Sequence, residues 1–341
     1  MFVLNGEERK IRIALPSKGR LSEETLQLMQ RSGLAVKRPN IRQYQATIPT
    51  LPGVEVLFQR AGDIAVSVRD GIVDLGISGL DVVSEVADDS KDILVMLDDL
   101  GFGGCKLYAI VPESAKDITQ IKDVDQLIPS KREKLRVATK FPNLTRRFFE
   151  KNNILNVDYI KAEGALEIAP LIGYADMITD LVSSGLTLRD NRLKVLDDGL
   201  ILKSQACLIA NRKNLVESSQ VMESARLLLE FIVAYLRAEG NVAVFANIRG
   251  RSMAEVADLI LGKEVIRGLQ GPTISKVITH QGENWFAVNL IIKKFQLGEA
   301  IKELRSIGGS GVVVTPINFI FEEEPEAYTR MLEELRRDYG R

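Results

Sequence analysis

The stretch Glu163-Gly-Ala-Leu-Glu-Ile-Ala-Pro-Leu-Ile-Gly-Tyr-Ala-Asp-Met-Ile-Thr-Asp-Leu-Val-Ser-Ser-Gly-Leu-Thr-Leu188 decides how this chain is organised. An apolar run over residues 177–182 ends in Ser183-Ser184-Gly185, and the residues that follow predict a helix. A strand, a glycine turn and a helix in that order are the building block of sheets covered by helices. The segment therefore favours an α/β fold.

The same turn carries groups that suit a phosphorylated sugar. Free backbone N–H groups, small hydroxyls and a glycine at the start of a helix make a cradle for phosphate. Asp180 lies just before the turn and Thr187 just after it, and a nearby carboxylate suits sugar hydroxyls or a magnesium ion. The alternative is a helix start capped by Ser183 or Ser184. The chain contains no Gly-x-x-x-x-Gly-Lys-Ser/Thr segment, which excludes a Walker A loop.

Outward from this segment, strands and helices alternate in a pattern that predicts two lobes. A first region carries strand-like runs and a helix that follows Leu21, with Ser22 as its N-cap. A second region begins with a strand that Pro112 ends. The chain leaves the first lobe near residue 104 and returns near residue 195, so we expect a cleft between lobes. The expected strands cover 11–15, 54–57, 64–68, 75–77, 107–111, 135–138, 157–160, 194–202 and 206–210, and the second region's helix covers 143–151.

The last third of the chain changes character. Residues 212–239 predict one long connecting helix that Gly240 ends. After it, strands and helices follow the order β-α-β-β-α-β, which is typical of a ferredoxin-like domain. The domains predicted in this way are lobe I (1–104 and 195–225), lobe II (105–194), a ferredoxin-like domain (240–322) and a helical tail (323–341).

Composition excludes several classes of function. The 45 basic and 46 acidic residues leave a net charge of −1, so nothing favours a nucleic-acid partner. No apolar run has the length of a membrane span, and the N-terminal residues resemble neither a signal nor a transit peptide, so we expect a cytoplasmic protein. Cys105 and Cys207 lie in apolar sequence and are expected to be buried free thiols. The single histidine, His280, leaves no His-rich zinc site and favours magnesium as any metal.

Two further loops are candidate ligand sites. Pro16-Ser17-Lys18-Gly19-Arg20 follows a strand, where open α/β sheets bind ligands, and its two cations suit phosphate. Its alternative is a solvated turn. Ser78, Gly79 and Asp81 end another strand-like run, either as a close approach to a ligand or as a tight turn with Asp81 as N-cap. Arg60 is a plausible anion ligand, although an exposed arginine is the usual case.

Together these segments resemble the ATP phosphoribosyltransferase family, the enzymes that open histidine biosynthesis, over almost the entire chain. Ile13-Ala-Leu-Pro-Ser-Lys-Gly-Arg-Leu21 resembles the family's first strand and loop, and residues 71–81 resemble its Gly-x-Asp-(Ile/Leu)-Gly-Ile-x-Gly-x-Asp segment. The family signature is the most specific match. It is met by Glu167, Gly173, Ala175, Ile178, Asp180, Leu181, Ser183, Ser184, Gly185, Thr187 and Leu188.

The C-terminal part resembles the long form of this family. Leu269-Gln-Gly-Pro-Thr-Ile-Ser275 and Gly308-Gly-Ser-Gly-Val-Val-Val-Thr-Pro316 are the matching pieces. The resemblance implies a ferredoxin-like (ACT-like) regulatory domain that binds histidine as inhibitor, with Leu269, Gly271 and Thr273 as effector-site candidates. It also implies homo-oligomers, dimers exchanging with hexamers, and no separate regulatory subunit.

For the remainder of the chain, the resemblance implies a two-lobed core similar to type II periplasmic binding proteins. It implies that adenine N1 of ATP attacks C1 of 5-phosphoribosyl 1-pyrophosphate and that Mg²⁺ is the cofactor. Asp180, Lys18 and Arg20 are the expected catalytic residues, and Asp180 is the expected metal ligand. The expected substrate-binding residues are Glu167, Ser183, Ser184, Gly185, Leu186, Thr187, Arg60, Ser78, Gly79 and Asp81.

The chain departs from the family pattern at two places. Ala165 replaces an expected hydroxyl, and Ser183-Ser184-Gly185 stands where Thr-Gly or Glu-Thr-Gly is usual. Two other classes of function share the two-lobed architecture: a ligand receptor or effector domain of a regulator, and an inactive regulatory paralogue. The chain shows no signal peptide and no helix-turn-helix segment, which those binding proteins need.

Overall fold

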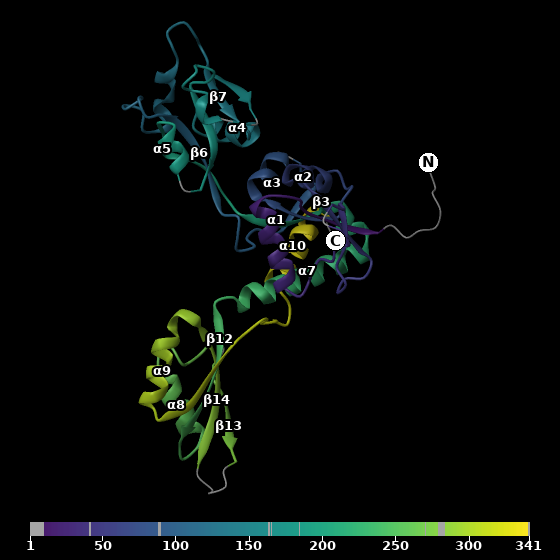
Figure 1. Cartoon of the computed structure of the whole chain (residues 1–341), viewed down its shortest axis with the longest axis vertical. Helices are drawn as coiled ribbons and strands as arrows, with labels where there is room; N and C mark the ends of the chain where they lie inside the picture. Colours follow the sequence, from purple (N-terminus) through teal and green to yellow (C-terminus); the bar gives the residue numbers. More distant parts are fainter. Residues whose placement is uncertain are drawn as a thin grey trace, which may run out of the picture. The chain divides into compact units, whose positions relative to one another are not determined.

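A computed structural model describes residues 10–40, 42–87, 90–162, 164, 166–183, 185–269, 271–278 and 284–339. The chain forms two compact units, which Figure 1 shows together with their elements. The first unit comprises 1–229 together with 326–341, and the second comprises 230–325.

The first unit contains a six-stranded sheet in the order β2-β3-β1-β4-β11-β5. Its central strand β1 pairs in parallel with β3 and β4, and β11 runs antiparallel between β4 and β5. The strands are β1 (Ile11–Pro16), β2 (Gln45–Thr47), β3 (Val54–Gln59), β4 (Leu75–Gly79), β5 (Ile93–Leu97) and β11 (Ala206–Asn211). The helices are α1 (Arg20–Arg31), α2 (Ala61–Arg69) and α3 (Leu80–Ala87).

Two local predictions for this sheet are wrong. Residues 64–68, expected to be strand-like, lie in α2, where Ile64, Ala65 and Val68 form one buried face at helical spacing. Packing against the sheet therefore overrides the β-branched composition of the run. Ser22 does not cap α1: the helix begins at Arg20 after Gly19, and Ser22 is buried inside it. The backbone of Gly19 has φ 76°, a conformation that glycine adopts without strain.

The first unit also contains a five-stranded sheet in the order β10-β6-β9-β7-β8. Strand β7 pairs in parallel with β8 and β9, and β6 pairs antiparallel with β9 and β10. The strands are β6 (Cys105–Pro112), β7 (Leu135–Thr139), β8 (Val157–Lys161), β9 (Met177–Val182) and β10 (Leu193–Ser204). The helices are α4 (Pro142–Lys151), α5 (Leu186–Asp190) and the 3₁₀ turns η1 (Ile121–Leu127) and η2 (Leu166–Ile168).

The chain returns to the first sheet later than the expected position near residue 195. Strand β10 pairs with β6 as far as Ser204, with irregular register between Val195 and Leu202, and β11 begins only at Ala206. Each lobe therefore has one mixed sheet, with helices that pack on it. This arrangement is that of the two-lobed, type II periplasmic-binding-protein-like core.

Hydrogen bonds join α3 of the first lobe to α4 of the second. The carboxylate of Glu85 accepts from the backbone N–H groups of Asn143 and Leu144, each at 2.9 Å. Arg147 donates to the carbonyl of Ser84 at 2.9 Å. The first-turn N–H groups of α4 are thus satisfied by a side chain of the other lobe, where a carboxylate also suits the helix dipole.

The connecting segment is two helices instead of the single helix expected over 212–239. α6 (Arg212–Glu217) ends at Ser218, and α7 (Ser219–Ala238) follows. The side chain of Asn211 accepts from the N–H of Asn214 and caps the start of α6. The boundary between the two units falls inside α7.

The second unit is a four-stranded antiparallel sheet in the order β13-β14-β12-β15. Helices α8 and α9 cover one face of the sheet (Figure 1). Their apolar faces, including Val256, Ile260, Ala300 and Leu304, are buried in one core with the inward residues of the strands. The elements are β12 (Asn241–Arg249), α8 (Met253–Leu261), β13 (Thr273–Val277), β14 (Trp285–Lys293), η3 (Lys294–Gln296), α9 (Leu297–Ser306) and β15 (Gly309–Pro316). This is the ferredoxin-like order and sheet topology.

The C-terminal tail forms α10 (Glu326–Tyr339) and belongs to the first unit. Arg212, whose side chain is nearly buried, donates to the carboxylate of Glu334 at 2.6 Å. Arg226 of α7 lies over the ring of Tyr328 at 5.8 Å. The chain therefore returns to the first unit after completing the ferredoxin-like domain.

Within the described ranges, no helix is both long and apolar enough to cross a membrane.

Candidate active site

The turn that follows β9 is built on a glycine. Gly185 has φ 73° and ψ 1°, the left-handed conformation, and stands at the N-cap of α5 without a side-chain cap. A Cβ at this position would meet nothing within 4 Å, so the backbone conformation alone favours glycine. Ser183 and Thr187 are exposed on either side of it. Ser183 is therefore not the cap of α5, and Ser184 lies outside the described residues.

Asp180 lies on β9 just before this turn, half-buried and directly opposite Tyr108 of β6. Its carboxylate accepts from the N–H of Leu181 at 2.8 Å. Burial raises the pKa of Asp180, and the negative charge of Glu167 adds to that rise. The Leu181 hydrogen bond and the positive charge of Lys140 act in the opposite direction. Asp180 and Glu167 thus form a pair of nearby carboxylates that a bound cation would stabilise.

Three buried threonines hold the strand ends behind Asp180. The Thr179 hydroxyl lies 2.6 Å from that of Thr139 and 2.7 Å from that of Thr145. Thr139 also accepts from the N–H of Phe141 at 2.9 Å. Because Thr179 and Thr139 directly precede Asp180 and Lys140, this hydroxyl cluster fixes the backbone from which both charged side chains project.

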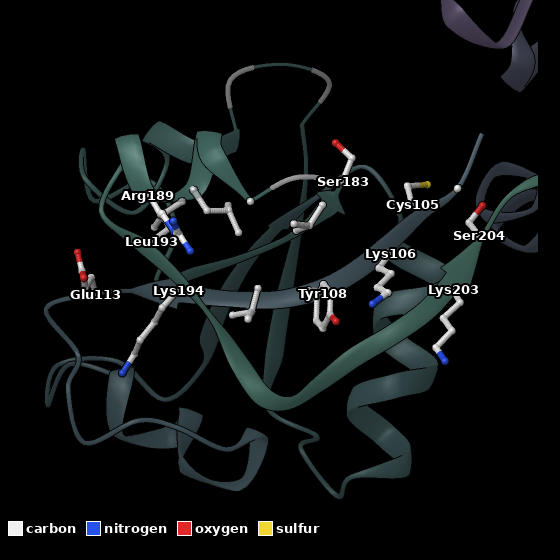
Figure 2. Close-up of a pocket in the computed structure, with 15 residues that line it drawn as sticks. Cys105, Lys106, Tyr108, Glu113, Ser183, Arg189, Leu193, Lys194, Lys203 and Ser204 are labelled. Carbon is white, nitrogen blue, oxygen red and sulfur yellow. The ribbon is translucent and has the colours of Figure 1, made fainter. Parts of the chain in front are cut away.

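A cavity of about 750 Å³ opens beside the turn (Figure 2). Ser183 and Gly185 line it together with residues of α5, β6 and β10. Figure 2 shows Ser183 and Lys106 toward one end of the cavity and Glu113 and Lys194 toward the other. The other lining residues are Gly104, Cys105, Tyr108, Val182, Leu188, Arg189, Leu193, Val195, Lys203 and Ser204. Cations outnumber carboxylates on this wall, which favours an anionic ligand.

The candidate cations of the first lobe meet at one edge of its sheet. Lys18 and Arg20 follow β1, and Arg60 follows β3, its parallel neighbour. The carboxyl ends of parallel neighbours lie at the same edge of a sheet, so all three residues follow strand ends at that edge. Lys18 and Arg60 are exposed, and Arg20 pairs with Glu24 one helical turn away at 3.0 Å.

Ser78, Gly79 and Asp81 lie at the end of the other parallel neighbour, β4, but their polar groups serve the fold. The Ser78 hydroxyl is buried and donates to the carbonyl of Ala61 at 3.0 Å. Asp81 is in the first turn of α3 and 6% exposed, and Ser204 donates to its carboxylate at 2.7 Å. The N–H of Asp81 in turn donates to Ser204 at 2.9 Å. These contacts tie the first lobe to the strand that connects the two lobes.

The two cysteines differ in burial. Cys207 is fully buried, and burial raises the pKa of its thiol to about 12. Cys105 is only half-buried, contrary to the expectation of two buried thiols, and it lines the cavity. Burial and the charge of Asp81 raise the pKa of Cys105 as well, so both groups are neutral thiols near pH 7.

The effector-site candidates belong to the second unit. Leu269 is 45% exposed, and its N–H donates to the carbonyl of Ile291 at 3.0 Å. Gly271 has φ 90°, and Thr273 is exposed at the start of the edge strand β13. His280 falls outside the described residues.

The donor set of the active site suits Mg²⁺ held mainly by a substrate. Among the described residues, no group of three or more histidine, cysteine or acidic side chains is placed to hold a metal ion. Mg²⁺ needs fewer protein ligands than that, because it usually binds one or two carboxylates together with substrate phosphates. Asp180 and Glu167 fit that pattern.

Sequence reasoning missed the cavity wall and the threonine cluster. Lys106, Tyr108 and Lys203 are separate residues of two strands, and they reach one cavity only because β6 and β10 pair. The alternation of residues along β6 could have placed Lys106 and Tyr108 on a common face, but it says nothing about Lys203 of β10.

The chain is similar to known ATP phosphoribosyltransferases over most of its length. Residues 60–231 match the family model described as HisG, ATP phosphoribosyltransferase, and residues 238–319 match HisG, C-terminal domain. ATP phosphoribosyltransferase 1, chloroplastic, from Arabidopsis thaliana is 41% identical over 96% of this chain and 82% of its own length. ATP phosphoribosyltransferase from Methanocaldococcus jannaschii is 36% identical over 91% of this chain and 99% of its own length.

A solved structure shows the same fold in the larger part of the chain. It is a chain of the ATP phosphoribosyl transferase (HisG:HisZ) complex from Thermotoga maritima, with a TM-score of 0.50 and 24% identity. The match covers 65% of this chain and 98% of that chain.

Proposed function

Because this chain belongs to the ATP phosphoribosyltransferase family, we propose that it condenses ATP with 5-phosphoribosyl 1-pyrophosphate. The products are N1-(5-phosphoribosyl)-ATP and pyrophosphate, and the step commits the substrates to histidine biosynthesis. One observation carries the proposal: Asp180 and the glycine turn at 183–187 lie at the same end of β9, beside a cation-lined cavity, inside the region matched by the family model.

In this reaction adenine N1 attacks C1 of the ribose, pyrophosphate leaves, and the configuration at C1 inverts. The transition state carries positive charge on the sugar ring, as in glycoside hydrolysis. Adenine N1 is already a competent nucleophile, so the protein needs no activated serine or cysteine. That fits an enzyme whose cysteines, Cys105 and Cys207, both have raised pKa values. The protein contributes chiefly by positioning the substrates and balancing charge.

The second lobe provides the site for phosphoribosyl pyrophosphate in this proposal. The backbone N–H groups and hydroxyls of Ser183, Ser184, Gly185, Leu186 and Thr187 hold the 5′-phosphate. Asp180 accepts the ribose hydroxyls and stabilises positive charge on the ring, and Glu167 supports it from 3₁₀ turn η2. Asp180 and Glu167 would hold Mg²⁺ together with substrate phosphates, and the ion would neutralise phosphate charge there.

The first lobe provides the site for ATP. Lys18 and Arg20 contact its phosphates, with Arg60 beside them at the same sheet edge. Ser78, Gly79 and Asp81 shape this edge, and the internal hydrogen bonds of Ser78 and Asp81 favour a supporting role over direct contact.

The second unit is the proposed regulatory domain. It matches the C-terminal domain model of the family, and its topology is ferredoxin-like. We propose that it binds histidine as a feedback inhibitor near Leu269, Gly271 and Thr273, and that the chain works as a homo-oligomer, a dimer or hexamer, without a separate regulatory subunit. The cytoplasmic location stays a prediction, since the Arabidopsis relatives are named chloroplastic.

One assay tests these proposals. The purified chain alone is mixed with both substrates and Mg²⁺, and phosphoribosyl-ATP is followed by its near-ultraviolet absorbance, with and without histidine. We expect product formation that histidine suppresses. Absence of product contradicts the proposed reaction, and product formation that is insensitive to histidine contradicts the regulatory proposal alone.

A further inference from the structure

We propose that Lys106 and Lys203 form a diphosphate-binding subsite, which takes the pyrophosphate group of phosphoribosyl pyrophosphate and holds it as it leaves. The inference rests on the proposed function and deepens it by naming residues that the sequence patterns did not single out. It starts from the register of three neighbouring strands.

Val182, Lys106 and Lys203 form one row across β9, β6 and β10. Lys106 is opposite Val182 on one side and opposite Lys203 on the other. Directly opposite residues of antiparallel strands project from the same face, with Cα atoms about 4.5–5.5 Å apart. The two lysines thus present two ammonium groups side by side to the cavity that both residues line.

A pair of like charges in this position needs an explanation. Like charges directly opposite each other destabilise a sheet, yet neither ammonium has an ion-pair partner among the residues that the structure describes. Functional sites often keep residues that destabilise the fold locally, and two opposed lysines are expected where a site binds an anion. A bound anion would turn the repulsion between Lys106 and Lys203 into a shared attraction.

The length of the Val182–Lys106–Lys203 row indicates how large the bound anion is. It begins at Val182, directly before Ser183 of the proposed 5′-phosphate turn, and reaches Lys203 two strand spacings away, or about 10 Å. A pentose with phosphate groups at its two ends is of this scale. Two neighbouring cations match the adjacent phosphates of a diphosphate better than a single phosphate. Figure 2 shows Lys106, Tyr108 and Ser183 on this part of the wall.

The chain offers a matched control in Lys194. This lysine also lines the cavity, but it lies opposite Val111, five residues farther along β6 than Lys106. Its ammonium donates to the carbonyl of Lys116 at 3.3 Å. Removing Lys194 changes the net charge as much as removing Lys106, so it separates a specific contact from a general electrostatic effect.

The test is calorimetric titration of the full chain with Mg²⁺ and three probes: inorganic pyrophosphate, phosphoribosyl pyrophosphate and ribose 5-phosphate. For Lys106→Ala and Lys203→Ala we expect pyrophosphate and phosphoribosyl pyrophosphate to bind about 10–100-fold more weakly. Ribose 5-phosphate should bind within about twofold of wild type, because its phosphate occupies the turn. Lys194→Ala should leave all three affinities unchanged, and Lys106→Arg should retain pyrophosphate binding.

A second readout follows from the repulsion. Lys203→Gln should raise the melting temperature of the ligand-free protein by about 1–2 °C, because it removes one of two opposed charges. If Lys203 had only a structural role, Lys203→Gln would lower the melting temperature or leave it unchanged.

Two results would overturn the inference: unchanged pyrophosphate affinity in both alanine variants, or equal weakening of all three probes. The titrations do not depend on turnover. A chain that binds pyrophosphate through these lysines but makes no phosphoribosyl-ATP would therefore contradict the proposed function and leave the subsite standing.

Discussion

The strand ends of the two sheets in the first unit carry similar residues but use them differently. At the first sheet, Ser78 donates to the carbonyl of Ala61 and Asp81 is bonded to Ser204, so both polar side chains serve the fold. At the second sheet, Asp180 is half-buried and Ser183 is exposed beside a cavity. Polar groups that are already satisfied internally contribute to stability, whereas groups that remain available can bind a substrate.

The largest expected effect concerns the second sheet. Asp180→Ala should lower turnover by about 10²–10³-fold, the usual effect of removing one well-aimed electrostatic contact. Its stability should be equal to or above that of wild type near neutral pH. Burial raises the pKa of Asp180 in the folded state, so the ionised carboxylate is less favourable there than in the unfolded chain. Asp180→Asn should lose turnover similarly.

At the first sheet the expected effect is on stability. Ser204→Ala removes both hydrogen bonds that Ser204 makes with Asp81 and leaves a buried carboxylate without them. We expect the free energy of unfolding to fall by about 1–3 kcal/mol, measured by urea titration. Ser183→Ala is the matched serine at the second sheet: it should leave stability unchanged and raise KM for phosphoribosyl pyrophosphate. The contrast between the two sheets is wrong if Ser183→Ala lowers stability and Ser204→Ala only raises KM.

The threonine cluster should show a smaller and mixed effect. Thr179→Val is close in shape and removes a hydroxyl bonded to Thr139 and Thr145. The expected loss is about 0.5–1.5 kcal/mol of stability, with a fall in kcat because the backbone beside Asp180 loosens. Thr179→Ser should restore both. A loss of stability with kcat unchanged would show that the cluster supports the fold and not the site.

The smallest effect is on the pH profile of kcat/KM, whose acid limb reports groups of the free enzyme. An ionised Asp180 is needed, and its pKa is raised, so activity should fall on the acid side at a higher pH than an ordinary aspartate allows. Glu167→Gln removes a charge that raises this pKa and should move the acid limb to lower pH. Lys140→Gln removes a charge that lowers the pKa and should move the limb to higher pH. If the acid limb moved in the opposite direction in either variant, a group other than Asp180 would set the acid limb.

Much of the fold could be predicted because it depends on local signals. Buried strands such as Leu135–Thr139, the helix Pro142–Lys151 and the β-α-β-β-α-β order all follow from apolar patterning and from prolines and glycines at element ends. Residues 64–68 misled the prediction because isoleucine and valine favour strands, whereas their helical spacing decides the packing. The position where the chain returns to the first lobe depends on how far β10 pairs with β6, which no local pattern reports.

The candidate site likewise contains some residues that a local motif predicts and others that only strand pairing brings together. Asp180 and the turn at Ser183–Gly185–Thr187 follow one another along the chain, and a contiguous motif carries them. The Lys106–Lys203 pair and the Ser204–Asp81 bond join residues about 100 positions or more apart. Only strand pairing brings such residues together, so their roles become visible in the structure alone. The sequence motif at 78–81 likewise does not reveal that its polar groups are bonded internally.

The central claim is that Asp180 at the end of β9 supports the chemistry, and single-turnover formation of phosphoribosyl-ATP tests it most directly. Wild-type and Asp180→Ala enzymes are mixed with saturating substrates and Mg²⁺, and the near-ultraviolet absorbance of the product is followed. A rate lower by about 10²–10³-fold in the variant, with an unchanged or raised melting temperature, is the predicted result. A rate close to that of wild type would contradict the account.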